Sequence, residues 1–303
     1  MKPILFAAAL AAAAACAPAA LAQNRPFDPR AYQDQAAGPP TQILVLGTPH
    51  LSGTPDDWDP AALEPLLERL AAFRPQAIMI EALSGESLDG LWRYRGIYSD
   101  AAVSFGARTL MLAALTQRTM QMEMPEAEAE VRRTLAAWPA EPSPAQRRRL
   151  AAPQLAAGDP HSAPVQWWRL DASERIAEDG FHPALIDALE AYAGRRNENH
   201  LIGARLAARL GLERVYPTDD QANADVGEQF IADLQAFHDA GWGDQILADE
   251  RFAPLRVAAQ NLNGPEQVMR TYRMLNRPAT GWLDADGQWL SMINRPYPNL
   301  VGS

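Results

Sequence analysis

The chain has 303 residues, of which 48% are hydrophobic and 21% are charged, and its net charge at pH 7 is −10. This composition is typical of globular proteins and excludes a largely disordered chain. Because the charge is acidic and the arginines are dispersed along the sequence, nothing in the composition predicts nucleic-acid binding.

The first 22 residues are predicted to be a cleaved signal peptide. Lys2 gives a basic start, residues 3–15 are apolar but too short for a comfortable membrane span, and Ala20–Ala22 fits the small-x-small cleavage pattern. We therefore expect a periplasmic or secreted protein with no membrane span. The alternative is a lipoprotein anchored through Cys16. Since Cys16 is the only cysteine, cleavage would leave no thiol for disulfides, catalysis or metal ligation.

Residues 23–40 are rich in proline and lack apolar periodicity, so we expect an extended linker before a single domain over 41–303. The continuous apolar run at 43–46 predicts a strand buried on both faces, and Gln76–Glu81 predicts a second strand. Between them, leucines from Leu63 onwards recur at helical spacing. Strand, helix and strand in this order predict a βαβ unit with two parallel neighbouring strands.

The rest of the chain is predicted to be mainly helical. Residues 84–182 are expected to form a helical insertion over one end of the sheet. After Pro183 the pattern predicts further helices, a short strand in "ERVYPTDD" that ends in two aspartates, and helices near 226–237 and 265–275. The predicted fold class is therefore α/β, with a central, largely parallel sheet, flanking helices and a helical insertion.

His50 and Glu81 are the leading candidates for chemistry. His50 follows the first predicted strand and Glu81 closes the second. Ligands of open parallel sheets bind beyond the carboxyl ends of the strands, so these side chains could meet in one crevice. Imidazole and carboxylate can ligate a catalytic metal, and they can equally serve as a metal-free acid–base pair that activates water. The alternative is that His50 bonds to a backbone carbonyl and Glu81 is merely solvated.

The same residues carry a resemblance. "LGTPH" followed by "IMIEAL" resembles the first G-x-x-H motif and the following glutamate of the superfamily that groups TraB/PrgY/GumN proteins, Tiki proteases, erythromycin esterases and haem-binding ChaN proteins. "RRNENHLIGARLAARLGLERVYPTDD" is similar to an uncharacterised bacterial branch of that group. The resemblance covers about residues 41–220. It implies an α/β fold with a site at the carboxyl edge of the sheet, in which His50 and Glu81 occupy motif positions.

One feature of that superfamily has no counterpart here. A second G-x-x-H arm is expected near the C-terminus, but nothing follows "RPYPNLVGS". Gly158–His161 has the spacing without a preceding apolar strand, and we interpret it as a coincidence. The expectation is that the chain is truncated at its C-terminus or lacks half of the site.

Other polar residues form a second tier of site candidates. Asn199 shares a helical stripe with buried leucines, and Arg195 lies one turn before it; they could hold an anion or orient Glu81, or Arg195 could reach water while Asn199 bonds to backbone. His200 is adjacent. Asp219 and Asp220 end a predicted strand and could reach the crevice or cap the next helix.

The predicted function is that of an exported hydrolase acting on a small-molecule or peptide substrate. His50 and Glu81 would ligate a divalent ion, with Mn, Zn or Co expected, or would activate water directly. The alternatives are a non-enzymatic protein that binds haem or another small ligand, and an inactive homologue. The sequence does not predict an oligomeric state.

Overall fold

The computed structural model describes residue 28 and residues 38–98, 101–221, 232, 235–260 and 262–289. The predicted signal peptide and most of the predicted linker lie outside the described residues, as does most of the helix predicted near 226–237. The described helices and strands belong to the unit that begins at Leu46.

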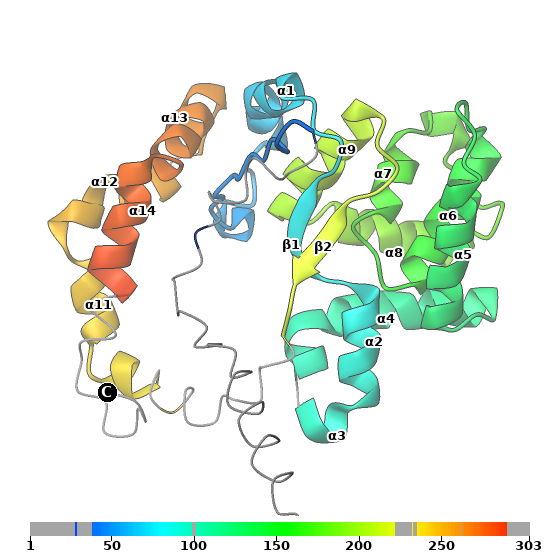
Figure 1. Cartoon of the computed structure of the whole chain (residues 1–303), viewed down its shortest axis with the longest axis horizontal. Coiled ribbons are helices and arrows are strands. Elements are labelled where there is room, and N and C mark those ends of the chain that lie inside the picture. The colour runs from blue at the N-terminus through cyan, green and yellow to red at the C-terminus, as the bar shows by residue number, and fades with distance from the viewer. Residues whose placement is uncertain are drawn as a thin grey trace, which may run out of the picture. The chain divides into compact units, whose positions relative to one another are not determined.

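The described part of this unit is mostly helical (Figure 1). Its first half contains η2 (Leu51–Gly53), η3 (Pro60–Leu63), α1 (Glu64–Ala72), β1 (Met79–Leu83), α2 (Gly85–Arg93), α3 (Arg95–Tyr98), α4 (Ala101–Met120), α5 (Met124–Ala136), α6 (Pro144–Ala156) and α7 (Ala163–Trp168). Its second half contains η4 (Ala172–Glu174), α8 (Pro183–Ala193), η5 (Asn199–Ala204), α9 (Arg205–Leu210), β2 (Tyr216–Asp219), α11 (Trp242–Leu247), η7 (Glu250–Phe252), α12 (Ala253–Gln260), α13 (Pro265–Leu275), α14 (Pro278–Asp284) and η8 (Ala285–Trp289).

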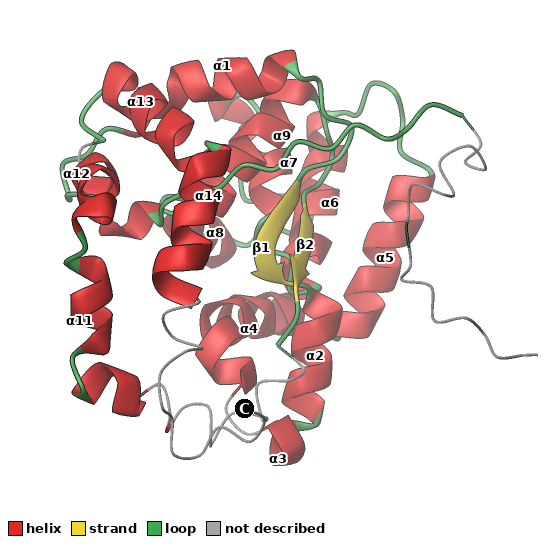
Figure 2. Cartoon of the chain, turned by 60° about the vertical axis from the view of Figure 1, so that its left-hand side comes forward, coloured by secondary structure: helices red, strands yellow, loops and turns green. Residues whose placement is uncertain are grey.

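The sheet of the described residues consists of β1 and β2, which run parallel (Figures 1 and 2). Met79 lies opposite Tyr216 and Leu83 opposite Asp219, with an irregularity in the register between them. The strand predicted from "ERVYPTDD" is thus confirmed, and β1 begins at Met79 rather than at Gln76 as predicted. The chain therefore combines helices with a small parallel sheet, which is the coarse form of the predicted α/β class.

The strand predicted at residues 43–46 is not formed, and this prediction was wrong. These residues are extended but belong to no strand, and Ile43 and Val45 are 79% and 84% exposed. A strand buried on both faces needs a partner strand and two covering layers, and an apolar run specifies neither. The predicted βαβ unit is therefore also wrong, because β1 pairs with the distant β2 instead.

The helix predicted between these two segments is confirmed. Asp59 caps η3 by accepting a hydrogen bond from Ala61 N, and Pro65 stands in the first turn of α1, where a proline costs no helical hydrogen bond. The leucine stripe of α1 is buried in a cluster that also contains Leu201 from η5 and Tyr272 from α13.

The segment 84–182 is helical, as predicted, and contains α2 to α7. Helix α6 packs against α4, α5 and α7. Its Leu155 lies in a core cluster with Trp167 of α7 and Leu185 of α8. Figure 2 shows α4 and α2 beyond the carboxyl end of β1. No helix of the described residues is long and apolar enough to cross a membrane.

We predict that Gly85→Ala destabilises the protein, because this glycine marks a close backbone approach at the start of α2. A methyl group at Gly85 would lie 1.7 Å from the carbonyl oxygen of Ala157, and a backbone oxygen cannot move aside freely. Overpacking of this kind costs about 1–3 kcal/mol or more. The measurement is the free energy of unfolding in urea.

Gly90→Ala in the same helix is the matched control. A methyl group there meets no atom within 4 Å, so the better helix propensity of alanine should stabilise α2 by roughly 0.5–1 kcal/mol. Equal effects of the two substitutions would contradict the packing of α2 on the end of α6.

Candidate functional site

His50 stands at the N-terminal end of η2 with a side chain that is 77% exposed. Its Nδ1 lies 2.7 Å from Oε1 of Glu198, whose own side chain is only 12% exposed. The other carboxylate oxygen of Glu198 accepts a hydrogen bond from the backbone N–H of Leu51 at 3.1 Å. Since a carboxylate only accepts hydrogen bonds, Nδ1 of His50 carries the hydrogen, and Nε2 of the neutral ring is left with a free lone pair.

The loop that carries His50 is held by α13. Gly47 N donates to Oδ1 of Asn276 at 2.7 Å, and Nδ2 of Asn276 donates back to the carbonyl oxygen of Gly47 at 2.9 Å. A side chain at Gly47 would approach the Asn276 amide to 3.4 Å, so the glycine permits this close pairing. The backbone is therefore fixed three residues before His50.

Glu198 raises the pKa of His50 above its ordinary value of 6.5. The largest cause is the hydrogen bond to the Glu198 carboxylate, followed by its Coulombic attraction for the imidazolium; partial burial opposes both, and the Glu81 charge adds a smaller increase. His50 is consequently protonated to a higher pH than a free histidine.

Glu81 lies on β1, where burial alternates along the strand: Ile80 is buried and Glu81 is exposed. Its backbone carbonyl accepts a hydrogen bond from Nδ2 of Asn199 at 2.8 Å. The structure thus brings Glu81 close enough to His50 to influence its charge, while the carboxylate in direct contact with the imidazole belongs to Glu198.

Glu198 was missed from the sequence, although it lies in the stretch "NENH" whose neighbours were candidates. Its side chain and that of Asn199 reach two segments more than 100 residues away, the His50 loop and β1. The available signal was the density of polar residues at a helix start. A glutamate in that position is normally interpreted as favourable for the helix dipole and solvated.

Tyr272 of α13 adds a buried phenol to this region. Burial and the Glu198 charge raise its pKa, so the hydroxyl stays neutral. Within the described part of the chain, this hydroxyl has no hydrogen-bond partner. It is a candidate hydrogen-bond donor that the sequence did not reveal.

His200 lies elsewhere, in a buried aromatic cluster, and the exposed Arg195 lies at the edge of that cluster. His200 Nε2 is 3.1 Å from Nδ1 of His161, the two rings stack with centroids 4.9 Å apart, and Tyr192 packs edge-on against both. The Arg195 guanidinium lies over the Tyr192 ring at 5.8 Å. Arg195 therefore packs at the edge of this cluster, and no hydrogen bond or ion pair joins its side chain to Glu81 among the described residues.

His161 is the histidine of the Gly158–His161 motif that the sequence presented as a coincidence of spacing. The structure buries its ring beside His200. Burial lowers the pKa of His161 to about 4 and that of His200 to about 2, with the nearby Arg195 charge adding to both effects. Both rings are neutral at pH 7, and His200 Nδ1 has no hydrogen-bond partner among the described residues.

Asp219 and Asp220 follow the end of β2. Asp219 lies opposite Leu83 and accepts hydrogen bonds from the backbone N–H of Asp220 and from the Gln221 side chain. These local contacts are those of a turn. No hydrogen bond connects Asp219 with His50 or Glu81 in the described residues.

The described donors do not by themselves complete a metal site. In the ranges that the structure covers, no three His, Cys, Asp or Glu side chains are grouped so that they could hold an ion. Catalytic zinc sites use three protein ligands, and His50 Nε2 with Glu81 would supply two.

No protein-family model matches this chain, and no curated protein or solved structure matches it. The superfamily resemblance therefore stays a prediction.

We predict that Glu198→Gln lowers the pKa of His50 toward 6.5, because an amide keeps one hydrogen bond but loses the negative charge. Glu81→Gln is the matched control and should lower the same pKa by a smaller amount, since Glu81 acts only through its charge. The His50 ring signal, identified with His50→Gln, is followed by NMR between pH 5 and 9. An equal effect of the two substitutions would contradict the His50–Glu198 contact.

We also predict that the buried histidine pair makes stability depend on pH. The folded state lowers both pKa values below the ordinary 6.5, so the unfolded state binds more protons at acidic pH. Stability is then complete above pH 6.5 and falls as the pH decreases, by up to about 1.4 kcal/mol per pH unit for each histidine.

The measurement compares urea unfolding of the wild type and His161→Gln between pH 7.5 and 5. Titrating groups away from the pair contribute equally to both proteins, so the difference in slope reports on His161 together with its effect on His200. The variant should lose less stability on acidification; identical slopes would show that His161 can be protonated in the folded state.

Proposed function

We propose that this protein is an exported hydrolase in which His50 acts as a general base on water. The observation that carries the proposal is the contact between His50 Nδ1 and Glu198 at 2.7 Å. It fixes the ring through one nitrogen and leaves Nε2 as a basic atom on an exposed side chain. A histidine oriented by a buried carboxylate is the arrangement that general-base catalysis uses.

Glu198 is the positioning residue of this proposal. Its two oxygens bind the His50 ring and the Leu51 backbone, so the imidazole is held against the start of η2. When Nε2 takes a proton from water, the carboxylate charge stabilises the imidazolium, which is the state that the raised pKa favours. The hydroxide formed would attack the carbonyl carbon of an ester or amide; the C–O or C–N bond then breaks, and the imidazolium returns its proton to the departing alcohol or amine.

Glu81 keeps a proposed role as the second carboxylate. It lies on the exposed face of β1, and its charge acts on the same imidazole. In a metal-dependent form of the reaction, His50 Nε2 and Glu81 would be two of the ligands, and the His50–Glu198 contact would be the outer-shell hydrogen bond that orients a ligating histidine. Such a metal site would need a third protein ligand.

Three predictions from the sequence belong to this proposal. The substrate is a small molecule or a peptide with an ester or amide bond, the location is the periplasm or the exterior, and the architecture is an α/β fold of the TraB/GumN-like group. The parallel pairing of β1 with β2 supports a parallel sheet, and the small Coulombic effect of Glu81 on the pKa of His50 supports the site.

The test is hydrolysis of a panel of aryl esters and short peptides, with and without a chelator, by the wild type and three variants. His50→Gln should reduce kcat/KM by about 10²–10⁴-fold, the usual contribution of a general base. Glu198→Gln should reduce it by about tenfold or more and move the acidic limb of the pH profile to lower pH, since it lowers the pKa of the base.

His238→Gln is the control, because this histidine is exposed and lies outside the site. It should leave the rate unchanged. Turnover that survives in His50→Gln would overturn the proposal, whereas loss of turnover with the chelator, joined by a bound divalent ion in elemental analysis, would identify the metal-dependent form.

A further inference from the structure

Helix α13 presents two different faces. Its inner face buries Val268, Thr271 and Tyr272. The opposite face carries Arg270 and Arg273, and Arg277 follows two residues beyond the helix end, at the N-cap of α14. All three arginines are exposed. The outer face therefore concentrates positive charge in a chain whose net charge is −10.

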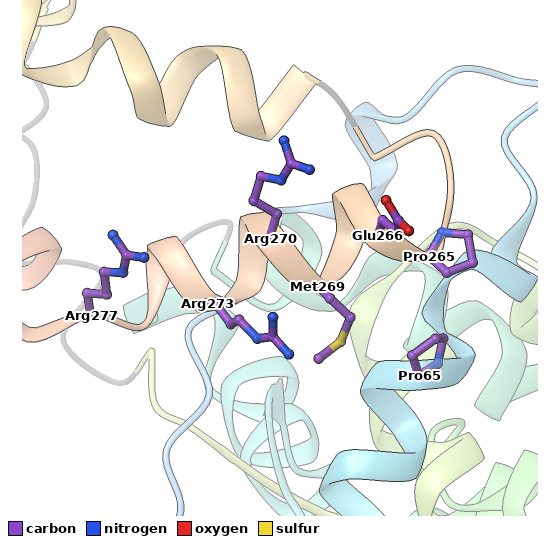
Figure 3. Close-up of a pocket in the computed structure, with 7 residues that line it drawn as sticks. All are labelled: Pro65, Pro265, Glu266, Met269, Arg270, Arg273 and Arg277. Carbon is purple, nitrogen blue, oxygen red and sulfur yellow. The ribbon is translucent and has the colours of Figure 1, made fainter.

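This face borders a pocket of about 490 Å³ between α13 and the first turn of α1 (Figure 3). The three arginines line the pocket together with an apolar part formed by Met269, Pro65 and Pro265, and Glu266 lies at the end near Pro265. Figure 3 shows the end of the Met269 side chain beside Arg273, while the Arg270 and Arg273 side chains extend to opposite sides of the helix in this view and Arg277 lies beyond the helix end.

Among the described residues, none of the three guanidinium groups forms an ion pair with a carboxylate, and Glu266 forms none with Arg270, four positions later. Some other arginines are paired: Arg148 and Arg149 share Asp179, and Arg147 and Arg169 share Glu213. Exposed arginines without an ion pair to a described carboxylate also occur elsewhere, such as Arg74 and Arg118. The α13 arginines differ from these because three of them line one pocket.

The spacing of the charges defines the ligand that fits them. Arg270 and Arg273 are helical neighbours three positions apart, at a separation of about 5–6 Å between Cβ atoms, and Arg277 lies four residues further along the chain, in the turn after α13. Guanidinium groups bind phosphate oxygens through paired hydrogen bonds, and a phosphate group can carry more negative charge than a carboxylate. A ligand with several phosphate groups would therefore match these three arginines.

We propose that the pocket between α13 and α1 binds a ligand with two or more phosphate groups, held by Arg270, Arg273 and Arg277. The apolar part around Met269 and Pro65 would contact the uncharged portion of the ligand. Two sources share this chemistry, a soluble oligophosphate and the phosphate groups displayed by a phospholipid surface.

The first experiment measures binding of inorganic triphosphate to the full chain by calorimetry at 20 mM NaCl. The variant Arg270→Gln/Arg273→Gln/Arg277→Gln should bind about tenfold more weakly or worse, because the three charge pairs contribute together. Raising NaCl to 300 mM should weaken wild-type binding through screening. Because the three side chains are exposed and unpaired, the variant should unfold at the wild-type temperature.

The matched control carries the same change of charge away from the pocket. Arg108→Gln/Arg118→Gln/Arg133→Gln removes three exposed arginines of α4 and α5 and should change the affinity by less than about twofold. An equal loss in the two triple variants would show that net charge alone attracts the ligand and would overturn the proposal. The single variant Arg273→Gln tests whether the pocket arginines bind the ligand while changing the net charge by only one unit.

The second experiment identifies the source. Vesicles of phosphatidylglycerol and phosphatidylcholine are compared with vesicles of phosphatidylcholine alone in a flotation assay. Triphosphate binding without flotation supports a soluble ligand, and flotation that requires phosphatidylglycerol and the three arginines supports a lipid surface. Absence of both overturns the proposal. Both readouts are independent of hydrolysis, so they do not depend on the proposed function.

Discussion

Four side chains between Arg196 and His200 connect segments that are far apart in the sequence. Glu198 binds the His50 ring and the Leu51 backbone, and Asn199 binds the backbone of β1 at Glu81. Arg196 reaches Pro55 and Asp56 beyond η2, and His200 stacks on His161. Apart from Asn197, whose side chain accepts a hydrogen bond from Asn199 N, the side chains of this segment thus contact distant parts of the chain. The wider π-helical turn that follows, η5, brings Gly203 against Ile80, where a methyl group would lie 2.8 Å from the Ile80 side chain.

This arrangement makes the candidate site a product of tertiary contacts rather than of one motif. His50 is fixed from two sides: Glu198 holds its ring, and Asn276 of α13 holds the backbone at Gly47. Helix α13 also places the neutral Tyr272 hydroxyl near Glu198. Tyr272 on the inner face of α13 and Asn276 at its C-cap therefore lie on the side of the site, whereas Arg270 and Arg273 lie on the outer face.

The sequence predicted the elements whose signal is local. The leucine spacing of α1 and the prolines at the first turns of α1 and α13 each specify a conformation through neighbours in the chain. The run at 43–46 failed for the opposite reason, because a strand exists only through its partner. The fold class could be predicted in outline, whereas the pairing of β1 with β2 could not.

The same difference between local signals and long-range contacts applies to single residues of the candidate site. His50 was predicted from its place after an apolar run, and Glu81 from its place at the end of another. The carboxylate that contacts His50 belongs instead to Glu198, at a helix start far along the chain. The Gly158–His161 motif lacks a preceding strand, so the sequence did not predict a site there. In the structure, Tyr192 packs against both His161 and His200, and no spacing rule connects it with them.

The difference between the two glutamates follows from where the backbone places them. Alternation along β1 puts Ile80 into the core and leaves the Glu81 carboxylate in solvent, where its attraction for His50 is weakened by water. Glu198 stands at the edge of the core between η2 and α13, with most of its side chain covered. A charge in that position interacts more strongly with a neighbouring imidazole, so the partner of His50 is decided by burial as well as by distance.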